Sequence, residues 1–186
     1  MDHLARALEL AERGRGKVGD HPLVGAVVVG DDGEVVGEGW YEYDGIEHAE
    51  AKALALAGER ARGATLCVTL EPCAHHGRTP PCTEAVVRSG VARVVVGSRD
   101  PNPKAAGGIE RLRDWGVDVE LVDSPAARRQ NEAWRTWVVE SRPFVTYKAA
   151  VSLDGRVTVP GERWVTGEAF SRAAPVQYRR FRFQAP

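Results

Sequence analysis

This 186-residue chain has few cysteines, almost no net charge and no long apolar run. Three cysteines are too few for a disulfide scaffold in a chain of this size. The 25 Lys and Arg residues against 26 Asp and Glu residues give a net charge of -1, and hence no electrostatic reason to expect a nucleic acid or an anionic membrane as partner. No run approaches the roughly 18 apolar residues of a membrane span, and the charged N-terminus does not resemble a signal peptide. We therefore expect a cytoplasmic protein.

What the chain does contain is enough apolar sequence for one substantial core, since 43% of its residues are hydrophobic. Helices are predicted before Gly14 and at residues 48–57, 82–89, 108–115 and 125–139. Strands are predicted at residues 23–30, 34–40, 64–70, 91–98 and 117–122, the first two as a hairpin around the turn at 31–33. Strands and helices that alternate with short loops predict an α/β fold, a three-layer α/β/α sandwich around a mixed sheet.

The character of the sequence changes near residue 142. We assign residues 1–141 to one domain and residues 142–186 to a second, truncated segment, which reads as strand and turn, then the start of a helix, then a basic tail. About 45 residues cannot bury a core of their own without a metal, disulfides or a partner. The second segment is therefore expected to be only the beginning of a domain.

Two of the cysteines bracket the loop "EPCAHHGRTPPC" at residues 71–82, and each follows a proline. Together with His48, in "EHAEA" upstream, Cys73 and Cys82 would offer Zn²⁺ two thiolates and one neutral imidazole. This leaves one tetrahedral position for a water, whose pKa the metal would lower to about 7. Glu50 could then carry protons without being a ligand. Because residues two apart on a helix point to different sides, His48 and Glu50 can converge only if the metal lies off the helix N-terminus.

Less specific interpretations of these residues stay open at this point. A structural zinc site would need a fourth ligand, His75 or His76, and would make the protein a non-catalytic module held together by zinc. That interpretation leaves Glu50 unexplained. Cys67 lies within an apolar strand and is interpreted as a core residue, and His21 could be a simple turn residue before a proline.

The H-x-E sequence at residues 48–50 and the paired proline–cysteine steps resemble the motifs of zinc deaminases. With "DPNP" at residues 100–103, they resemble the deaminase domain of the riboflavin-biosynthesis bifunctional pyrimidine deaminase–reductase family, over roughly residues 2–172. The resemblance implies a cytidine deaminase-like fold and hydrolysis of the amino group of a diaminopyrimidinone that carries a ribosylamine 5-phosphate. It also implies that the second segment opens the reductase domain, without reductase activity; the residues that match its opening signature are Lys148, Ser152, Asp154 and Gly155.

Residue by residue, the resemblance implies that His48, Cys73 and Cys82 are the ligands of a zinc cofactor and that Glu50 is the proton shuttle. The substrate contacts that it implies are His21, Tyr41, His75, Arg78, Thr79, Asp100 and Asn102. Arg78 could hold the phosphate by charge-assisted hydrogen bonds.

The chain departs from the family's pattern at two of these positions. The family usually has Asn where this chain has His21, and often His where it has Tyr41. The expected partner is a phosphorylated pyrimidine, with neither nucleic acid nor membrane. Because of the two departures, a different pyrimidine, nucleoside or base stays open as the substrate, and assembly into a homo-oligomer is open as well.

Overall fold

The computed structural model describes residues 2–43, 47–77 and 79–146. The chain divides into two units, residues 1–144 and 145–186, and all the helices and strands named below belong to the first. The predictions for Arg78 and for the reductase-like residues Lys148, Ser152, Asp154 and Gly155 lie outside the described residues. The predicted boundary after residue 141 stays a prediction, because most of the second segment is likewise not described.

A five-stranded mixed sheet lies at the centre of this unit, with the strand order β2-β1-β3-β4-β5. The strands are β1 (Gly25–Val29), β2 (Val35–Trp40), β3 (Thr65–Val68), β4 (Arg93–Val96) and β5 (Asp118–Leu121). β1 pairs antiparallel with β2 and with β3, whereas β3, β4 and β5 run parallel. The predicted hairpin and the predicted mixed sheet are both confirmed.

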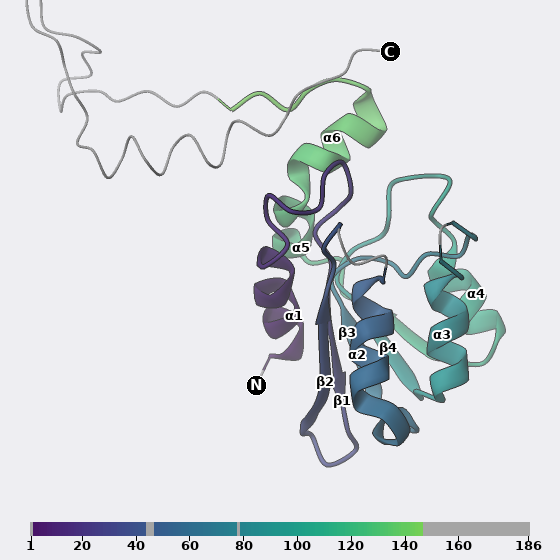
Figure 1. The fold of residues 1–186 in the computed structure, drawn as a ribbon. Helices are drawn as coiled ribbons and strands as arrows, with labels where there is room; N and C mark the ends of the chain where they lie inside the picture. Colours follow the sequence, from purple (N-terminus) through teal and green to yellow (C-terminus); the bar gives the residue numbers. More distant parts are fainter. Residues whose placement is uncertain (1, 44–46, 78, 147–186) are drawn as a thin grey trace, which may run out of the picture. The chain divides into compact units, whose positions relative to one another are not determined.

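Helices cover both faces of the sheet (Figure 1). On one side lie α1 (His3–Glu12) and α5 (Pro125–Gln130), which leads into α6 (Glu132–Glu140); on the other lie α2 (Ala49–Ala57), the 3-10 turn η1 (Gly58–Ala61), α3 (Cys82–Ser89) and α4 (Gly108–Asp114). Neighbouring residues of β1 point to opposite layers, since Val27 belongs to the α1 core with Leu10 and Val28 to the α2 core with Ala53. The predicted three-layer sandwich is confirmed. No helix among the described residues is long and apolar enough to cross a membrane.

Two glycines in β2 determine how closely α2 approaches the sheet. A Cβ atom on Gly37 would lie 2.1 Å from the carbonyl oxygen of Ala53, and one on Gly39 would lie 2.2 Å from that of Ala49. Any side chain at either position would push the helix away from the strand. Since Ala49 is the first residue of α2, these contacts fix the N-terminus of the helix against the sheet.

The single helix predicted at residues 125–139 is wrong: the structure has two helices, α5 and α6, with a break at Asn131. There the backbone leaves the helical conformation, with φ -107° and ψ 18°. The side chain of Asn131 is buried and forms hydrogen bonds with the backbone of Leu23, far away in the sequence. A helical pattern in the sequence does not reveal such a distant partner.

Candidate metal centre

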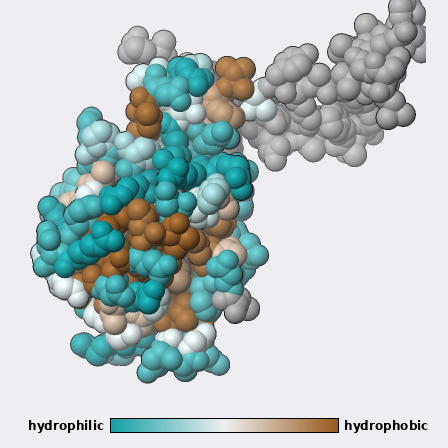
Figure 2. Space-filling model, turned by 180° about the vertical axis from the view of Figure 1, so that it is seen from behind, coloured by the Kyte–Doolittle hydropathy of each residue, from teal (hydrophilic) through white to brown (hydrophobic). Residues whose placement is uncertain are grey.

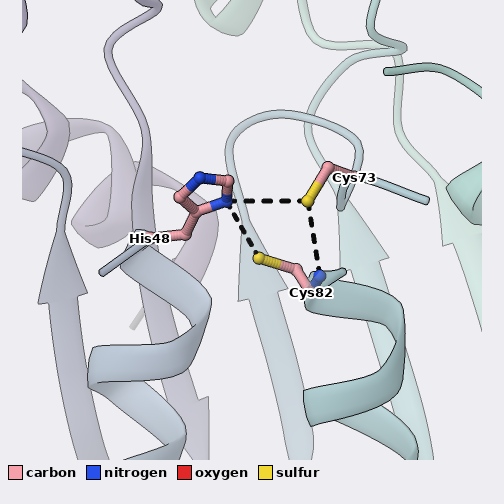
Figure 3. A group of neighbouring side chains, drawn as sticks. All are labelled: His48, Cys73 and Cys82. Atoms are coloured by element: carbon pink, nitrogen blue, oxygen red, sulfur yellow. Dashed lines mark hydrogen bonds between the residues drawn. The ribbon is translucent and has the colours of Figure 1, made fainter. Parts of the chain in front are cut away.

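The N-termini of two helices and the loop between β3 and α3 meet at one point (Figure 3). His48 is the N-cap residue of α2, Cys82 is the first residue of α3, and Cys73 lies in the loop between β3 and α3. Nδ1 of His48 lies 3.1 Å from Sγ of Cys82 and 3.6 Å from Sγ of Cys73. Among the described residues, these three form a group whose ligand atoms all lie within 4.8 Å of one another. The structure therefore brings together the three predicted ligands.

The spacing of these atoms fits zinc. With Zn–S bonds of about 2.3 Å and Zn–N bonds of about 2.0 Å, a tetrahedral site separates nitrogen and sulfur ligands by roughly 3.5 Å. The separations of 3.1 and 3.6 Å between Nδ1 and the two sulfurs bracket that value. Two thiolates and an imidazole are also a donor set that zinc prefers, and three protein ligands are typical of catalytic rather than structural sites.

The pKa values of the two thiols shift in opposite directions. The Cys82 side chain, His48 and the Cys82 backbone N–H, which lies 3.3 Å from Sγ of Cys73, all lower the pKa of Cys73 against the effect of burial. The Cys73 thiolate and burial in turn raise the pKa of Cys82, because a second negative charge would lie beside the first. The pKa of His48 is raised, mainly by its hydrogen bond with Cys73. A divalent cation would relieve the repulsion and favour both thiolates.

Glu50 is buried beside this group, in the first turn of α2, with only 3% of its surface exposed. Burial raises its pKa to about 7, while the charge on His48 and a hydrogen bond with the Cys82 side chain oppose the shift. A carboxyl group with such a pKa gains and loses a proton readily near neutral pH. The placement at the helix N-terminus is the one that the sequence spacing required.

Of the predicted substrate residues, Tyr41 lies next to the metal group and His21 lies next to Tyr41. The ring of Tyr41 meets that of His48 edge-on, with centroids 5.8 Å apart. The ring of His21 lies 5.5 Å from that of Tyr41 and 5.8 Å from that of Tyr43. The rings of His21 and Tyr41 form a row that leads from the half-exposed His21 to His48 of the metal group. Sequence analysis did not single out Tyr43, which lies two residues beyond Tyr41.

The other predicted substrate residues differ in exposure. Asp100 is buried, and burial is the main cause that raises its pKa to about 6. Its carboxylate accepts the N–H of Asn102 at 2.8 Å. Asn102 and Thr79 are half-buried and His75 is exposed, whereas Arg78 is not described. Neither His75 nor His76 belongs to the metal group found among the described residues. This counts against the structural-zinc interpretation, which needs one of them as fourth ligand.

Sequence analysis missed Glu71, a buried carboxylate that links the centre to its surroundings. It accepts three backbone N–H groups, those of Asp100 at 3.1 Å, Gly107 at 3.0 Å and Ile109 at 3.1 Å. Since Cys73 follows two residues later, Glu71 ties the loop of residues 71–82 (the metal loop) to the loop of Asp100 and to the start of α4. The available signal was an acid at the end of a buried strand, where a carboxylate needs partners.

Comparisons with known proteins agree with this geometry. A family model described as the cytidine and deoxycytidylate deaminase zinc-binding region matches residues 1–98. The riboflavin biosynthesis protein RibD of Aquifex aeolicus (strain VF5) is 46% identical over 182 residues, which cover 96% of this chain and 51% of that protein. RibD of Escherichia coli (strain K12) is 48% identical over 169 residues, 88% of this chain and 46% of that protein.

Two solved structures are similar as well. RibD of Acinetobacter baumannii superposes with a TM-score of 0.83 at 43% identity, covering 93% of this chain and 49% of that one. The diaminohydroxyphosphoribosylaminopyrimidine deaminase/5-amino-6-(5-phosphoribosylamino)uracil reductase of Thermotoga maritima gives a TM-score of 0.83 at 43% identity, with 91% of this chain and 50% of that one covered. The chain thus spans about half the length of these relatives.

The family model covers more than half of the chain and includes His48, Cys73 and Cys82. The predicted cytidine deaminase-like fold and the predicted zinc cofactor are confirmed by the matching family and by the similar structures. The chain belongs to the family of deaminases that share the cytidine and deoxycytidylate deaminase zinc-binding region.

Proposed function

We propose that the chain is a zinc-dependent hydrolytic deaminase of a phosphoribosylated aminopyrimidine. The observation that carries this proposal is the buried carboxyl of Glu50 beside three side chains suited to zinc. The relatives support the same reaction, since those 43–48% identical to the chain are named for riboflavin biosynthesis or for this deaminase. The substrate named for the Thermotoga maritima protein is the expected one.

His48, Cys73 and Cys82 would hold the zinc ion. When bound, zinc supplies Lewis-acid activation of a water molecule near neutral pH. The Cys73 and Cys82 thiolates would balance the charge of the ion, and Cys82 is held in place as the first residue of α3.

Glu50 would move the protons that the reaction requires. Hydrolytic deamination forms a bond between a water oxygen and the ring carbon, and breaks the bond from that carbon to the exocyclic nitrogen. One proton must pass from the water to the neighbouring ring nitrogen, and another must reach the amino group, which leaves as ammonia. A carboxyl whose pKa is about 7 can accept and donate in turn at neutral pH. Its burial shields these transfers from bulk water.

Substrate contacts are proposed on two sides of the centre. His21 and Tyr41 would contact the pyrimidine, because the ring of Tyr41 lies beside His48 and the ring of His21 lies beside Tyr41. Asp100 and Asn102 would contact the substrate from the loop after β4, with His75, Arg78 and Thr79 from the metal loop. A different pyrimidine, nucleoside or base is the second candidate substrate. It is favoured by the aromatic row at residues 21, 41 and 43, whose flat faces would accept rings of several kinds.

A panel of substrates tests the proposed function. Zinc-loaded protein is incubated with diaminohydroxyphosphoribosylaminopyrimidine, its dephosphorylated form, cytidine, deoxycytidylate and guanine, and ammonia release is measured. We expect the highest kcat/KM for diaminohydroxyphosphoribosylaminopyrimidine. A preference for one of the others would favour the second candidate, and no release from any of them at full zinc content would contradict a deaminase and favour the non-catalytic module.

Replacing Arg78 with alanine is expected to weaken the binding of the phosphorylated substrate by about 1.5–3 kcal/mol, the range for hydrogen bonds to charged groups. The dephosphorylated form should be nearly unaffected, since it lacks the group that the guanidinium would hold. The ratio of kcat/KM for the two substrates measures the effect. Arg88→Ala, which removes an exposed arginine of α3, is the matched control and should leave that ratio unchanged. Equal losses on both substrates would show that Arg78 serves the loop instead of the phosphate.

A further inference from the structure

The break between α5 and α6 is occupied by a side chain with two distant hydrogen bonds. The Asn131 carboxamide accepts the N–H of Leu23 and donates to the carbonyl oxygen of Leu23, both at 2.8 Å. Asn131 is 4% exposed and Leu23 is 6% exposed, so both bonds are shielded from water. Leu23 follows His21 by two residues, and the His21 N–H is bonded to Val18 at 3.1 Å. The paired bonds therefore fix the loop at residues 18–23 on the start of α6.

One helical turn further, Arg135 holds a second loop. Its backbone N–H donates to the carbonyl oxygen of Asn131 at 2.8 Å, and its Nη1 donates to that of Arg99 at 3.0 Å. Arg99 directly precedes Asp100, whose carboxylate attracts the half-buried guanidinium. Glu71 also holds this loop, by accepting the Asp100 N–H. The first turn of α6 thus contacts two loops that are far apart in the sequence.

These two loops carry the proposed substrate contacts: residues 18–23 carry His21, and the loop after β4 carries Asp100 and Asn102. We propose that Asn131 and Arg135 are positioning residues, which set the distance between the two loops and so determine substrate affinity and specificity. This inference rests on the proposed function, because that function makes the loops the binding surfaces. It also gives the helix break a role: both polar groups of the Asn131 side chain are used on Leu23.

The inference predicts that Asn131→Ala raises the dissociation constant of the deaminated product, 5-amino-6-(5-phosphoribosylamino)uracil, about 10- to 100-fold, the size of the effect when residues that orient metal ligands are removed. KM should rise more than kcat falls, and zinc content should not change, because Glu50 and the ligands are untouched. Product binding is measured by calorimetry on the full zinc-loaded chain. Gln130→Ala is the matched control. It removes the neighbouring side chain, which bonds to Leu8 and Glu12 of α1 and to neither loop, and should leave affinity unchanged.

A double-mutant cycle separates positioning from general stability. In the His21→Ala background, Asn131→Ala should cost less than about twofold in product affinity, because residues that act through one another are not additive. If Asn131→Ala does not fold, Arg135→Met is used instead, in a cycle with Asn102→Ala. Arg135→Met keeps the apolar stem and leaves the Arg99 carbonyl open to water.

The outcomes are distinguishable. Additive effects in the cycle, or equal losses of affinity in the Asn131→Ala and Gln130→Ala variants, would overturn the inference while the proposed function stands. If the unsubstituted protein neither releases ammonia from the phosphoribosylated substrate nor binds its product, the proposed function is wrong and the inference falls with it.

Discussion

Glu50→Gln is expected to lower turnover by about 10²–10⁴-fold, the usual contribution of a general acid–base group, while one zinc ion per chain is retained. The amide has nearly the shape of the carboxyl but cannot take up and return a proton at neutral pH. Glu50 is buried, its pKa is raised to about 7, and it is not one of the three residues in the metal group. The substitution should therefore remove the proton transfers and leave zinc binding intact.

Metal analysis and steady-state turnover measure these two effects separately. Glu47→Gln makes the same chemical change at an exposed position three residues away and should keep full activity. Loss of zinc in Glu50→Gln would make Glu50 a ligand, and unchanged turnover would remove it from the mechanism. A loss in both glutamate variants would point to a general change at the start of α2.

Cys82→Ala is expected to abolish turnover by removing zinc. Outer-shell substitutions around metal sites typically cost about 10–100-fold in metal affinity, and the loss of one of only three protein ligands should cost more than that. The Cys82 side chain is buried 3.1 Å from Nδ1 of His48, and its backbone N–H donates to Sγ of Cys73. The backbone bond should persist, so the helix should still begin at residue 82.

Cys67→Ala is the matched control for this prediction. Cys67 is a buried free thiol of β3, packed in the α1 core with its pKa raised to about 11 by burial, which agrees with its interpretation as a core residue. The substitution removes the same atom but should leave both zinc content and turnover in place. A Cys82→Ala protein with a full equivalent of zinc, measured by metal analysis after dialysis, would contradict the proposed ligand set.

The local features of the fold were predictable because they depend on residues near one another in the sequence. Apolar runs identified all five strands, and the turn at residues 31–33 identified the hairpin. Gly90 ends α3 in the left-handed conformation, with φ 73°, as expected of a glycine that follows a helix. The prediction of a single helix at 125–139 was wrong for the opposite reason. The break in that helix depends on the hydrogen bonds of Asn131 with Leu23, 108 residues earlier in the sequence.

The sequence by itself determined which candidate residues could do the chemistry. The H-x-E spacing and the two proline–cysteine steps predict the side chains for a metal and for proton transfer, and they require His48 and Glu50 to meet at a helix N-terminus. Only the tertiary structure decided that His48, Cys73 and Cys82 converge, that Glu71 ties the metal loop to Asp100, and that the start of α6 holds two loops. The physical reason is that a sequence motif fixes the kind and spacing of donor atoms, whereas the distances between those atoms depend on how the helices pack against the sheet. That packing is decided by contacts between residues far apart in the chain, such as the approach of Leu4 in α1 to Gly97, directly after β4.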